Sequence, residues 1–323
     1  MLKKNSSKTI FNTEIAPGEN KIIQLPIGSL PTGTPIQIPV YIFNGTEKGP
    51  TVLLQGGLHG DEINGVETCK RMLVNEYFTQ VKKGCIIVIP LLNVYGFIHF
   101  SRELPDGKDV NRSFPGAKQG SLAGRIAYYH THEILPHIDF GIDFHTGGAM
   151  RNNYPQIRYT TGCEKSKKLA KLFNAPIQFE SNLIKKSFRA TAKKQEKAIL
   201  VYEGGESMRF DEFAINEGIQ GTLKVLHHFK MITLPPVAVR KRKNKTIELT
   251  NRKWMRARKG GIFTANILNG DAIEKDQVIG YITDAYGNSS TVIKAPFDGR
   301  VFCINNHPLV NQGDALFHIG KAV

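Results

Sequence analysis

The sequence predicts a three-layer α/β protein with a mixed, mostly parallel sheet and helices on both faces, followed by a small all-β domain. Apolar runs of strand length alternate with segments whose apolar residues recur at helical spacing. Three of these runs, at 51–54, 139–145 and 198–203, end in polar residues and glycines, as the carboxyl ends of parallel strands do. Beyond about residue 240 the helical pattern disappears. We therefore expect an α/β fold and a separate β region.

The expected boundary between the two regions lies at a pair of prolines, Pro235 and Pro236, followed by the basic run 240–243. A chain of 323 residues is long enough for one large domain and a smaller one. We assign residues 1–238 to the α/β domain and residues 239–323 to the β domain.

The formal charge of +15 indicates an attraction for anions. Basic residues cluster at 165–171, 240–243 and 252–259, but no nucleic-acid motif accompanies them. Solvated surface therefore explains the clusters better than polyanion binding, and no nucleic-acid partner is expected. A field of this sign also attracts small carboxylate substrates.

The compartment follows from the termini and the cysteines. The first residues contain no apolar signal segment, and no apolar run approaches the ~20 residues of a membrane helix. The four cysteines are widely spaced without a C-x-x-C, so buried free thiols are expected. These features favour a cytoplasmic protein with no membrane contact.

A candidate metal site lies in the stretch 51–67, TVLLQGGLHGDEINGVE. His59 and Glu62 fall on the turn between the strand at 51–54 and a helix, three residues apart. His145 ends a second apolar run, at 139–145, and lies beside a glycine turn. A His₂Glu set at one sheet edge, with a fourth position open to water, is typical of catalytic zinc sites. The pattern predicts one Zn²⁺ per chain. An isolated H-x-x-E is common by chance, and the third residue is what favours a metal.

A carboxylate ends the third apolar run, at 198–206, AILVYEGGE. Glu203 directly ends the strand and is expected at the same edge as the metal ligands. A carboxylate there, outside the ligand set, is suited to be the general base on a zinc-bound water. Glu206 is the competing candidate, and the strand position favours Glu203.

These ordered motifs resemble the zinc carboxypeptidase superfamily: H-x-x-E, then D-x-N-R, then a single histidine, then a glutamate that ends an apolar strand. Within it, GGLHGDE and DVNRSFPG are most similar to the succinylglutamate desuccinylase and aspartoacylase branch, over residues 50–206. The resemblance implies a carboxypeptidase-like fold, zinc-dependent deacylation and Glu203 as the general base.

The loop 93–116 is long, polar and rich in glycine and proline, which favours a functional role. By the resemblance, Asn111 and Arg112 hold the substrate carboxylate, and Arg102 polarises the scissile carbonyl. Asp109 is similar to the acid that orients a ligand histidine. After His145, Arg158 is expected to bind substrate, with Arg151 and Tyr154 as further candidates for the pocket wall.

Several smaller expectations concern single elements. The segment 36–43 alternates and contains Pro39, which predicts an edge strand. Ser121 and Asp211 are expected to begin helices. His130, His132 and His137 do not share one helical face, and we expect them to be partly exposed.

The region after residue 240 contains a quasi-repeat in which Ile273, Ile279 and Ile282 align with Val310, Leu316 and Ile319. Two similar halves predict a small barrel or sandwich. The segment 295–301 together with 313–316 resembles lipoyl and biotinyl domains, but the joining hairpin 284–291 has no lysine to modify. We expect this domain to close over the active-site mouth or to form a subunit contact.

The hypothesis that follows is a zinc-dependent hydrolase that cleaves the amide bond of a small, carboxylate-bearing N-acyl amino acid. A metallocarboxypeptidase or an esterase on related substrates is the nearest alternative. A non-catalytic binding protein with a basic surface is an alternative of another class. The motifs leave open the acyl group, the preference for amide or ester, and whether the chain forms a homo-oligomer.

Overall fold

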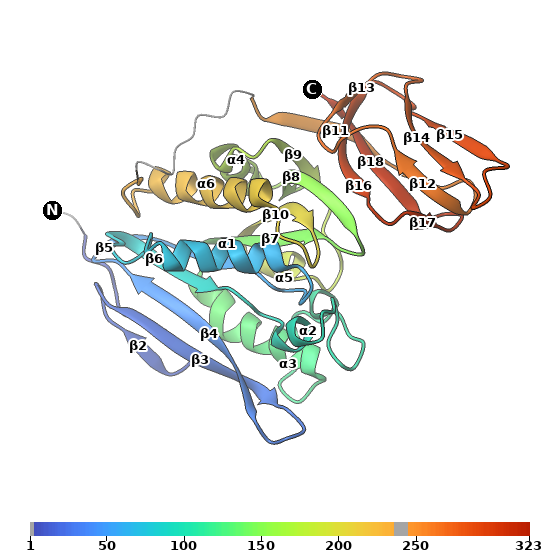
Figure 1. Ribbon diagram of the computed structural model, residues 1–323. Helices are drawn as coiled ribbons and strands as arrows, with labels where there is room; N and C mark the ends of the chain where they lie inside the picture. The colour runs from blue at the N-terminus through green and yellow to red at the C-terminus, as the bar shows by residue number, and fades with distance from the viewer. Residues whose placement is uncertain (1–2, 236–244) are drawn as a thin grey trace.

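The computed structural model describes residues 3–235 and 245–323, so the expected boundary at residue 238 and the basic run 240–243 lie outside the described residues. One mixed sheet of twelve strands extends through both parts of the chain, and helices cover its two faces in the first part (Figure 1). In spatial order its strands are β13 (Ala272–Ile273), β16 (Gly299–Asn305), β18 (Ala315–Ala322), β11 (Ile247–Arg256), β9 (Ile177–Ser181), β8 (Arg151–Thr160), β10 (Ala198–Glu206), β7 (Phe140–Gly147), β5 (Glu47–Gln55), β6 (Lys83–Ile89), β4 (Pro35–Asn44) and β3 (Asn20–Ser29).

The sheet is mixed, as predicted, and its centre is parallel, but antiparallel pairs outnumber parallel ones over its whole width, so it is not mostly parallel. β6, β5, β7 and β10 pair in parallel, and their carboxyl ends meet at one edge. Antiparallel pairs join β10 to β8 and flank the centre at β4 and β3, so the sheet is mixed over its whole width. The short strands β1 (Lys8–Ile10) and β2 (Thr13–Ile15) form a separate hairpin.

Two apolar cores separate the helices into layers. One face packs on α1 (Ile63–Val74), α4 (Glu164–Phe173) and α6 (Glu212–His228). The other packs on α3 (Leu122–Tyr129) and α5 (Phe188–Lys194). Ser121 and Asp211 cap α3 and α6 through their side chains, as predicted.

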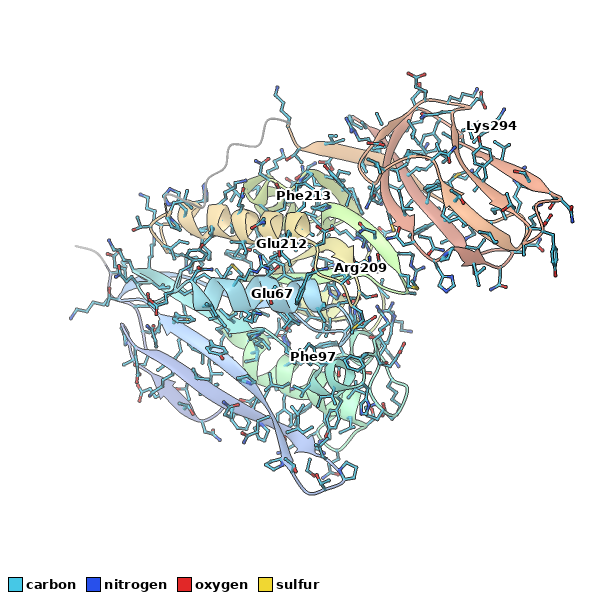
Figure 2. All side chains as sticks on the ribbon, in the orientation of Figure 1. Glu67, Phe97, Arg209, Glu212, Phe213 and Lys294 are labelled. Atoms are coloured by element: carbon cyan, nitrogen blue, oxygen red, sulfur yellow. The ribbon has the colours of Figure 1, made fainter. Side chains whose placement is uncertain are left out.

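An ion-pair network fixes α1 against the start of α6. Arg71 donates to Glu67 within α1, and its two terminal nitrogens donate to both oxygens of Glu212 at 2.7 and 2.6 Å. Figure 2 shows Glu67 and Glu212 close together on one side of the molecule. The network therefore ties the last turn of α1 to the first residue of α6.

Two predictions about this region were wrong. The strand with Pro39 is not at the edge, because β4 lies between β3 and β6. β6 pairs only with Tyr41 to Asn44, so β4 has a single neighbour, β3, at Pro39. The missing N–H of proline therefore breaks no hydrogen bond to β6. His130 is fully buried rather than partly exposed, because one π-helical turn, His130–Ile134, follows α3 and directs it inward.

The second part of the chain is all β in the described residues. Four of its strands extend the long sheet, and β15 (Ser290–Lys294), β14 (Val278–Thr283), β12 (Gly261–Ala265) and β17 (Leu309–Val310) form a second sheet. The aligned residues of the quasi-repeat, from Ile273 to Ile319, are all buried in the core between these sheets. A further small core joins Phe302 and Leu249 to Ile177 and Phe179 of the first part.

Candidate active site

The site lies at the carboxyl edge of the parallel strands. Gly57 turns the chain at the end of β5 with a φ of 59°, a conformation that favours glycine. Gly60 allows close packing, because a Cβ there would overlap the backbone at Gly96. The turn brings His59 and Glu62 next to the end of β7. His145 and Glu203 are register partners on the neighbouring strands β7 and β10.

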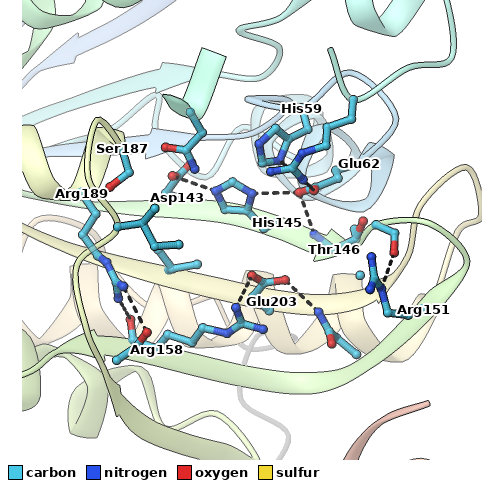
Figure 3. A pocket seen from close by; sticks show the side chains of 18 of the residues that line it. His59, Glu62, Asp143, His145, Thr146, Arg151, Arg158, Ser187, Arg189 and Glu203 are labelled. Carbon is cyan, nitrogen blue, oxygen red and sulfur yellow. Dashed lines mark hydrogen bonds and ion pairs between the residues drawn. The ribbon is translucent and has the colours of Figure 1, made fainter. Parts of the chain in front are cut away.

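His59, Glu62 and His145 converge as a buried cluster (Figure 3). Their candidate ligand atoms all lie within 4.8 Å of one another. Nδ1 of His59 lies 2.7 Å from Oε1 of Glu62, and Nδ1 of His145 lies 2.8 Å from Oε2 of the same carboxylate. Two imidazoles and one carboxylate therefore present lone pairs to a common centre.

Each histidine of this cluster has a carboxylate at its other ring nitrogen. Asp143 Oδ2 lies 2.9 Å from His145 Nε2, and Asp109 Oδ1 lies 3.3 Å from His59 Nε2. The hydrogen bond to Asp143 favours the proton of His145 on Nε2 and leaves its Nδ1 free for a metal, while Asp109 lies at ion-pair distance from His59. The donor set and its surroundings therefore fit Zn²⁺.

The charges within the cluster are strongly coupled. Burial raises the pKa of the Glu62 carboxyl, but the two adjacent histidines outweigh burial and bring this pKa well below its usual range. Burial lowers the pKa of His145, and the carboxylates of Asp143 and Glu62 raise it well above its usual value. The site thus stabilises positive charge at its centre, as a cation-binding site must.

Arg102 reaches the cluster from the loop after β6. Its Nη1 lies 3.2 Å from Glu62 Oε1, and its Nε and Nη2 donate to Asp109 Oδ2 at 3.2 and 3.0 Å. The guanidinium is therefore fixed beside the metal ligands by two carboxylates. Asp109 also accepts a hydrogen bond from the backbone N–H of Asn111 at 2.6 Å, which stabilises the turn between these two loop residues.

Asn111 and Arg112 line the same pocket, and their expected contact with a substrate carboxylate stays a prediction. Asn111 Oδ1 accepts from the backbone N–H of Phe188 at 2.9 Å, so its amide nitrogen remains the donor for a ligand. Arg112 donates to the carbonyl of Asn111, and its half-exposed side chain lies at the pocket mouth.

Glu203 lies across the cavity from the cluster, between two donors (Figure 3). Arg158 Nη1 lies 3.1 Å from its Oε1, and Asn153 donates to its Oε2 at 2.8 Å. Both partners come from β8, which pairs with β10. Glu206 instead accepts from Asn306 at 2.6 Å. The geometry thus assigns Glu203, rather than Glu206, to the pocket.

The profile of the succinylglutamate desuccinylase/aspartoacylase catalytic domain matches residues 48–229, more than half of the chain. The chain belongs to the succinylglutamate desuccinylase/aspartoacylase family.

One relative of this desuccinylase/aspartoacylase family member is a deacetylase, and two solved structures share its fold. The chain is 28% identical over 302 residues to the N-alpha-acetyl-L-2,4-diaminobutyric acid deacetylase of Halomonas elongata, covering 89% of this chain and 86% of that enzyme. A succinylglutamate desuccinylase/aspartoacylase from Rhodobacter sphaeroides has the same fold, with a TM-score of 0.81 and 24% identity over 94% and 95% of the two chains. The product-bound ectoine utilization protein EutE (DoeB) from Ruegeria pomeroyi also has this fold, with a TM-score of 0.81 and 24% sequence identity over 94% of each chain.

The desuccinylase/aspartoacylase site contains further residues that the sequence did not single out. Arg189 on α5, Asn153 on β8 and Trp254 on β11 all line the cavity, whose volume is about 240 Å³. Arg189 is buried, and no carboxylate of the described residues lies within ion-pair distance of it. Its Nη2 donates to Asn182 O at 2.8 Å and to Ser181 Oγ at 3.1 Å. An arginine at the start of a short helix with two lysines at its end gives no signal of its own in the sequence.

Two further expectations concern membrane-spanning helices and cysteines. No helix among the described residues is long and apolar enough to cross a membrane. The cysteine expectation also agrees in part: Cys69, Cys85 and Cys303 are free and buried, whereas Cys163 is half-buried.

Proposed function

We propose that this desuccinylase/aspartoacylase family member is a zinc-dependent hydrolase that cleaves the amide bond of a small N-acyl amino acid. The observation that carries the proposal is the convergence of His59, Glu62 and His145 on one centre, with Glu203 on the facing wall of the same pocket. A His₂Glu set with an open fourth position is the catalytic arrangement of zinc.

When bound, zinc would polarise the scissile carbonyl and lower the pKa of a coordinated water toward ~7. Glu203 accepts a proton from the attacking water and delivers it to the leaving amine. Arg158 and Asn153 hold its carboxylate in place on the wall of the pocket. Arg102 donates to the oxygen on which negative charge develops.

Arginines supply the affinity for a carboxylate-bearing substrate. Arg112 and Asn111 hold one carboxylate at the pocket mouth, and Arg158 forms part of the wall. Arg189 supports a second anionic group, because a buried guanidinium without a carboxylate partner is stabilised by an anionic ligand. Burial lowers the pKa of Arg189 to about 10, so it remains charged at neutral pH. A substrate with two acidic groups fits this pocket better than one with a basic side chain.

The described part of the β domain, residues 245–323, closes one side of the pocket. Trp254 and Cys303 reach the cavity from β11 and β16. The two sheets with a common buried core support the barrel or sandwich architecture. The resulting cavity of about 240 Å³ is below the range of roughly 300–1,000 Å³ typical of drug-sized ligands, which favours a small substrate over a peptide.

The test is amine release from a matched set of substrates: N-acetyl and N-succinyl derivatives of aspartate, glutamate and 2,4-diaminobutyrate, with a dipeptide and an ester for comparison. We expect turnover of the acidic N-acyl amino acids, loss of turnover with a chelator, and recovery with zinc. A preference for the dipeptide would favour a carboxypeptidase. Absence of hydrolysis throughout, with zinc bound, would contradict the proposed substrate class.

A further inference from the structure

A buried chain of hydrogen bonds leads from the candidate metal centre into the opposite layer of the molecule. His145 Nε2 lies 2.9 Å from Asp143 Oδ2, Gln55 Nε2 donates to Asp143 Oδ1 at 3.0 Å, and His130 Nε2 lies 2.5 Å from Gln55 Oε1. All four side chains are buried, and Gln55 and His130 are fully so. Figure 3 shows the end of this chain, where Asp143 contacts His145.

Three elements bring these groups together. Gln55 and Asp143 are register partners on the parallel strands β5 and β7. Asp143 and His145 are two residues apart on β7 and therefore face the same side of the sheet. His130 begins the π-helical turn after α3, an irregularity that is frequent at functional sites. The rings of Phe114 and Phe188 enclose it, with centroids 5.7 and 4.5 Å away.

The direction of every hydrogen bond in the chain follows from its central carboxylate. An ionised Asp143 only accepts, so the NH₂ group of Gln55 must face it, and the amide oxygen of Gln55 must face His130. That oxygen also only accepts, so His130 must carry its proton on Nε2. At the other end, Asp143 requires the proton of His145 on Nε2, which leaves Nδ1 free for a metal. The amide donates on one side and accepts on the other, so the chain fixes orientation rather than conducting protons.

A purely structural role explains His130 poorly. Its Nδ1 has no hydrogen-bond partner among the described residues, because the phenyl rings around it offer none. An unsatisfied buried polar atom destabilises the folded state, and an apolar residue would fill the same space without that penalty. Burial also lowers the pKa of His130 to about 4, so the ring stays neutral at neutral pH and keeps the tautomer that the chain requires.

We propose that His130 and Gln55 are positioning residues for the metal centre, which act through Asp143 to hold His145 in its metal-binding tautomer and orientation. This inference rests on the proposed zinc site. Neither residue touches the pocket or the cluster. Their contribution is to fix Asp143, which would otherwise be free to rotate away from His145.

The first measurement is zinc affinity, determined by competition with a chromophoric chelator. Gln55→Met keeps the length of the side chain and removes both hydrogen bonds. We expect it to weaken zinc binding by up to about 10-fold, the lower end of the loss caused by removing a direct partner of a metal ligand, because Gln55 acts on His145 through Asp143. His130→Phe should cause a smaller loss, and His130→Gln should restore affinity because it returns an N–H donor. The matched control is Gln178→Met, a buried glutamine on β9 that donates to Glu248 instead, and its affinity should match the wild type.

The second measurement is the tautomer of His130 in zinc-loaded protein with ¹⁵N-labelled histidine rings. We expect the ring proton of His130 on Nε2. Its NMR signal is identified by its absence in His130→Phe, and it should shift in Gln55→Met. A proton on Nδ1 would overturn the inference. So would wild-type zinc affinity in Gln55→Met with a native circular dichroism spectrum. If the wild type itself bound no zinc, the proposed centre would fail; if the wild type and Gln55→Met bound zinc equally, only the role of the chain would fail.

Discussion

At the scale of single residues, Glu203 separates the proposed chemistry from metal binding. It lies in the same cavity as His59, Glu62 and His145, and its two partners, Arg158 and Asn153, are on β8 rather than among those three residues. A change at Glu203 is therefore expected to affect catalysis without removing a ligand.

Glu203→Gln should lower kcat by at least about 10³-fold with little change in zinc content, because the amide keeps the shape but cannot accept the proton. Glu206→Gln is the matched control, since Glu206 accepts from Asn306 outside the pocket, and it should retain most activity. Full activity in Glu203→Gln, or inactivation by Glu206→Gln alone, would reject Glu203 as the base. Steady-state kinetics of both variants, with metal analysis of the same samples, decides whether Glu203 or Glu206 is the base.

His130 also predicts a pH dependence of stability. Burial lowers its pKa from 6.5 to about 4, so between these values the unfolded chain takes up a proton that the folded chain does not. The free energy of unfolding should therefore fall as the pH falls through this window, by on the order of 3 kcal/mol from this residue. Urea denaturation of metal-free protein should show a shallower slope between pH 6.5 and 4.5 for His130→Phe. An equal slope in both proteins would contradict the buried, neutral state.

At the scale of elements, the packing of α6 on α4 depends on a glycine. A Cβ at Gly221 would overlap the ring of Phe173, which is fully buried between the two helices. Such contacts fix the layer that lies over β10 and the site.

Gly221→Ala should lower the melting temperature, because overpacking costs about 1–3 kcal/mol and the higher helix propensity of alanine returns only about 1. Gly124→Ala in α3 is the control: the nearest atom to its added Cβ is Ser121 Oγ at 3.4 Å, so we expect no loss of stability. Stabilisation by Gly221→Ala in thermal melts would show that the helices are not packed as described.

The elements that the sequence predicted best were those with strong local patterns. The helix Glu164–Phe173 has the expected limits, and β10 begins at Ala198 as expected, because apolar runs and amphipathic spacing are local signals. The predicted end of that strand at Glu203 was wrong, because β10 continues to Glu206. The position of β4 and the burial of His130 could not be predicted in this way. Both depend on neighbours distant in sequence: β6 stops short of Pro39, and Gln55 on β5 accepts the His130 hydrogen bond.

The same distinction holds within the site. His59 and Glu62 follow the end of β5, and His145 and Glu203 lie in the last residues of β7 and β10. Glycines mark these positions in the sequence, and the structure brings the four residues to one edge. Arg189 and Asn153 have no such marker. They reach the cavity only because α5 and β8 pack beside β10, a tertiary relationship that a single sequence does not reveal.

At the scale of the whole molecule, the long sheet joins the two parts of the chain. β11 pairs with β9, and β16 pairs with β8, so backbone hydrogen bonds cross from one part to the other. The small core of Ile177, Phe179, Leu249 and Phe302 spans the same junction. The two parts should therefore unfold as one cooperative unit.

Two spectroscopic probes can test this cooperativity. The single tryptophan, Trp254, is in the second part, whereas the described helices all lie in the first. We expect tryptophan fluorescence and circular dichroism at 222 nm to report the same midpoint in denaturant, as coincident transitions do for one cooperative unit. A separate fluorescence transition at lower denaturant would indicate an independently folding β domain.

The metal content of three purified proteins is the most direct test of the central claim. If His59, Glu62 and His145 bind one cation in this structure, the wild type and Glu203→Gln should each contain about one zinc per chain, and His145→Ala should lose it. Zinc absent from the folded wild type, or retained at full stoichiometry in His145→Ala, would contradict the account.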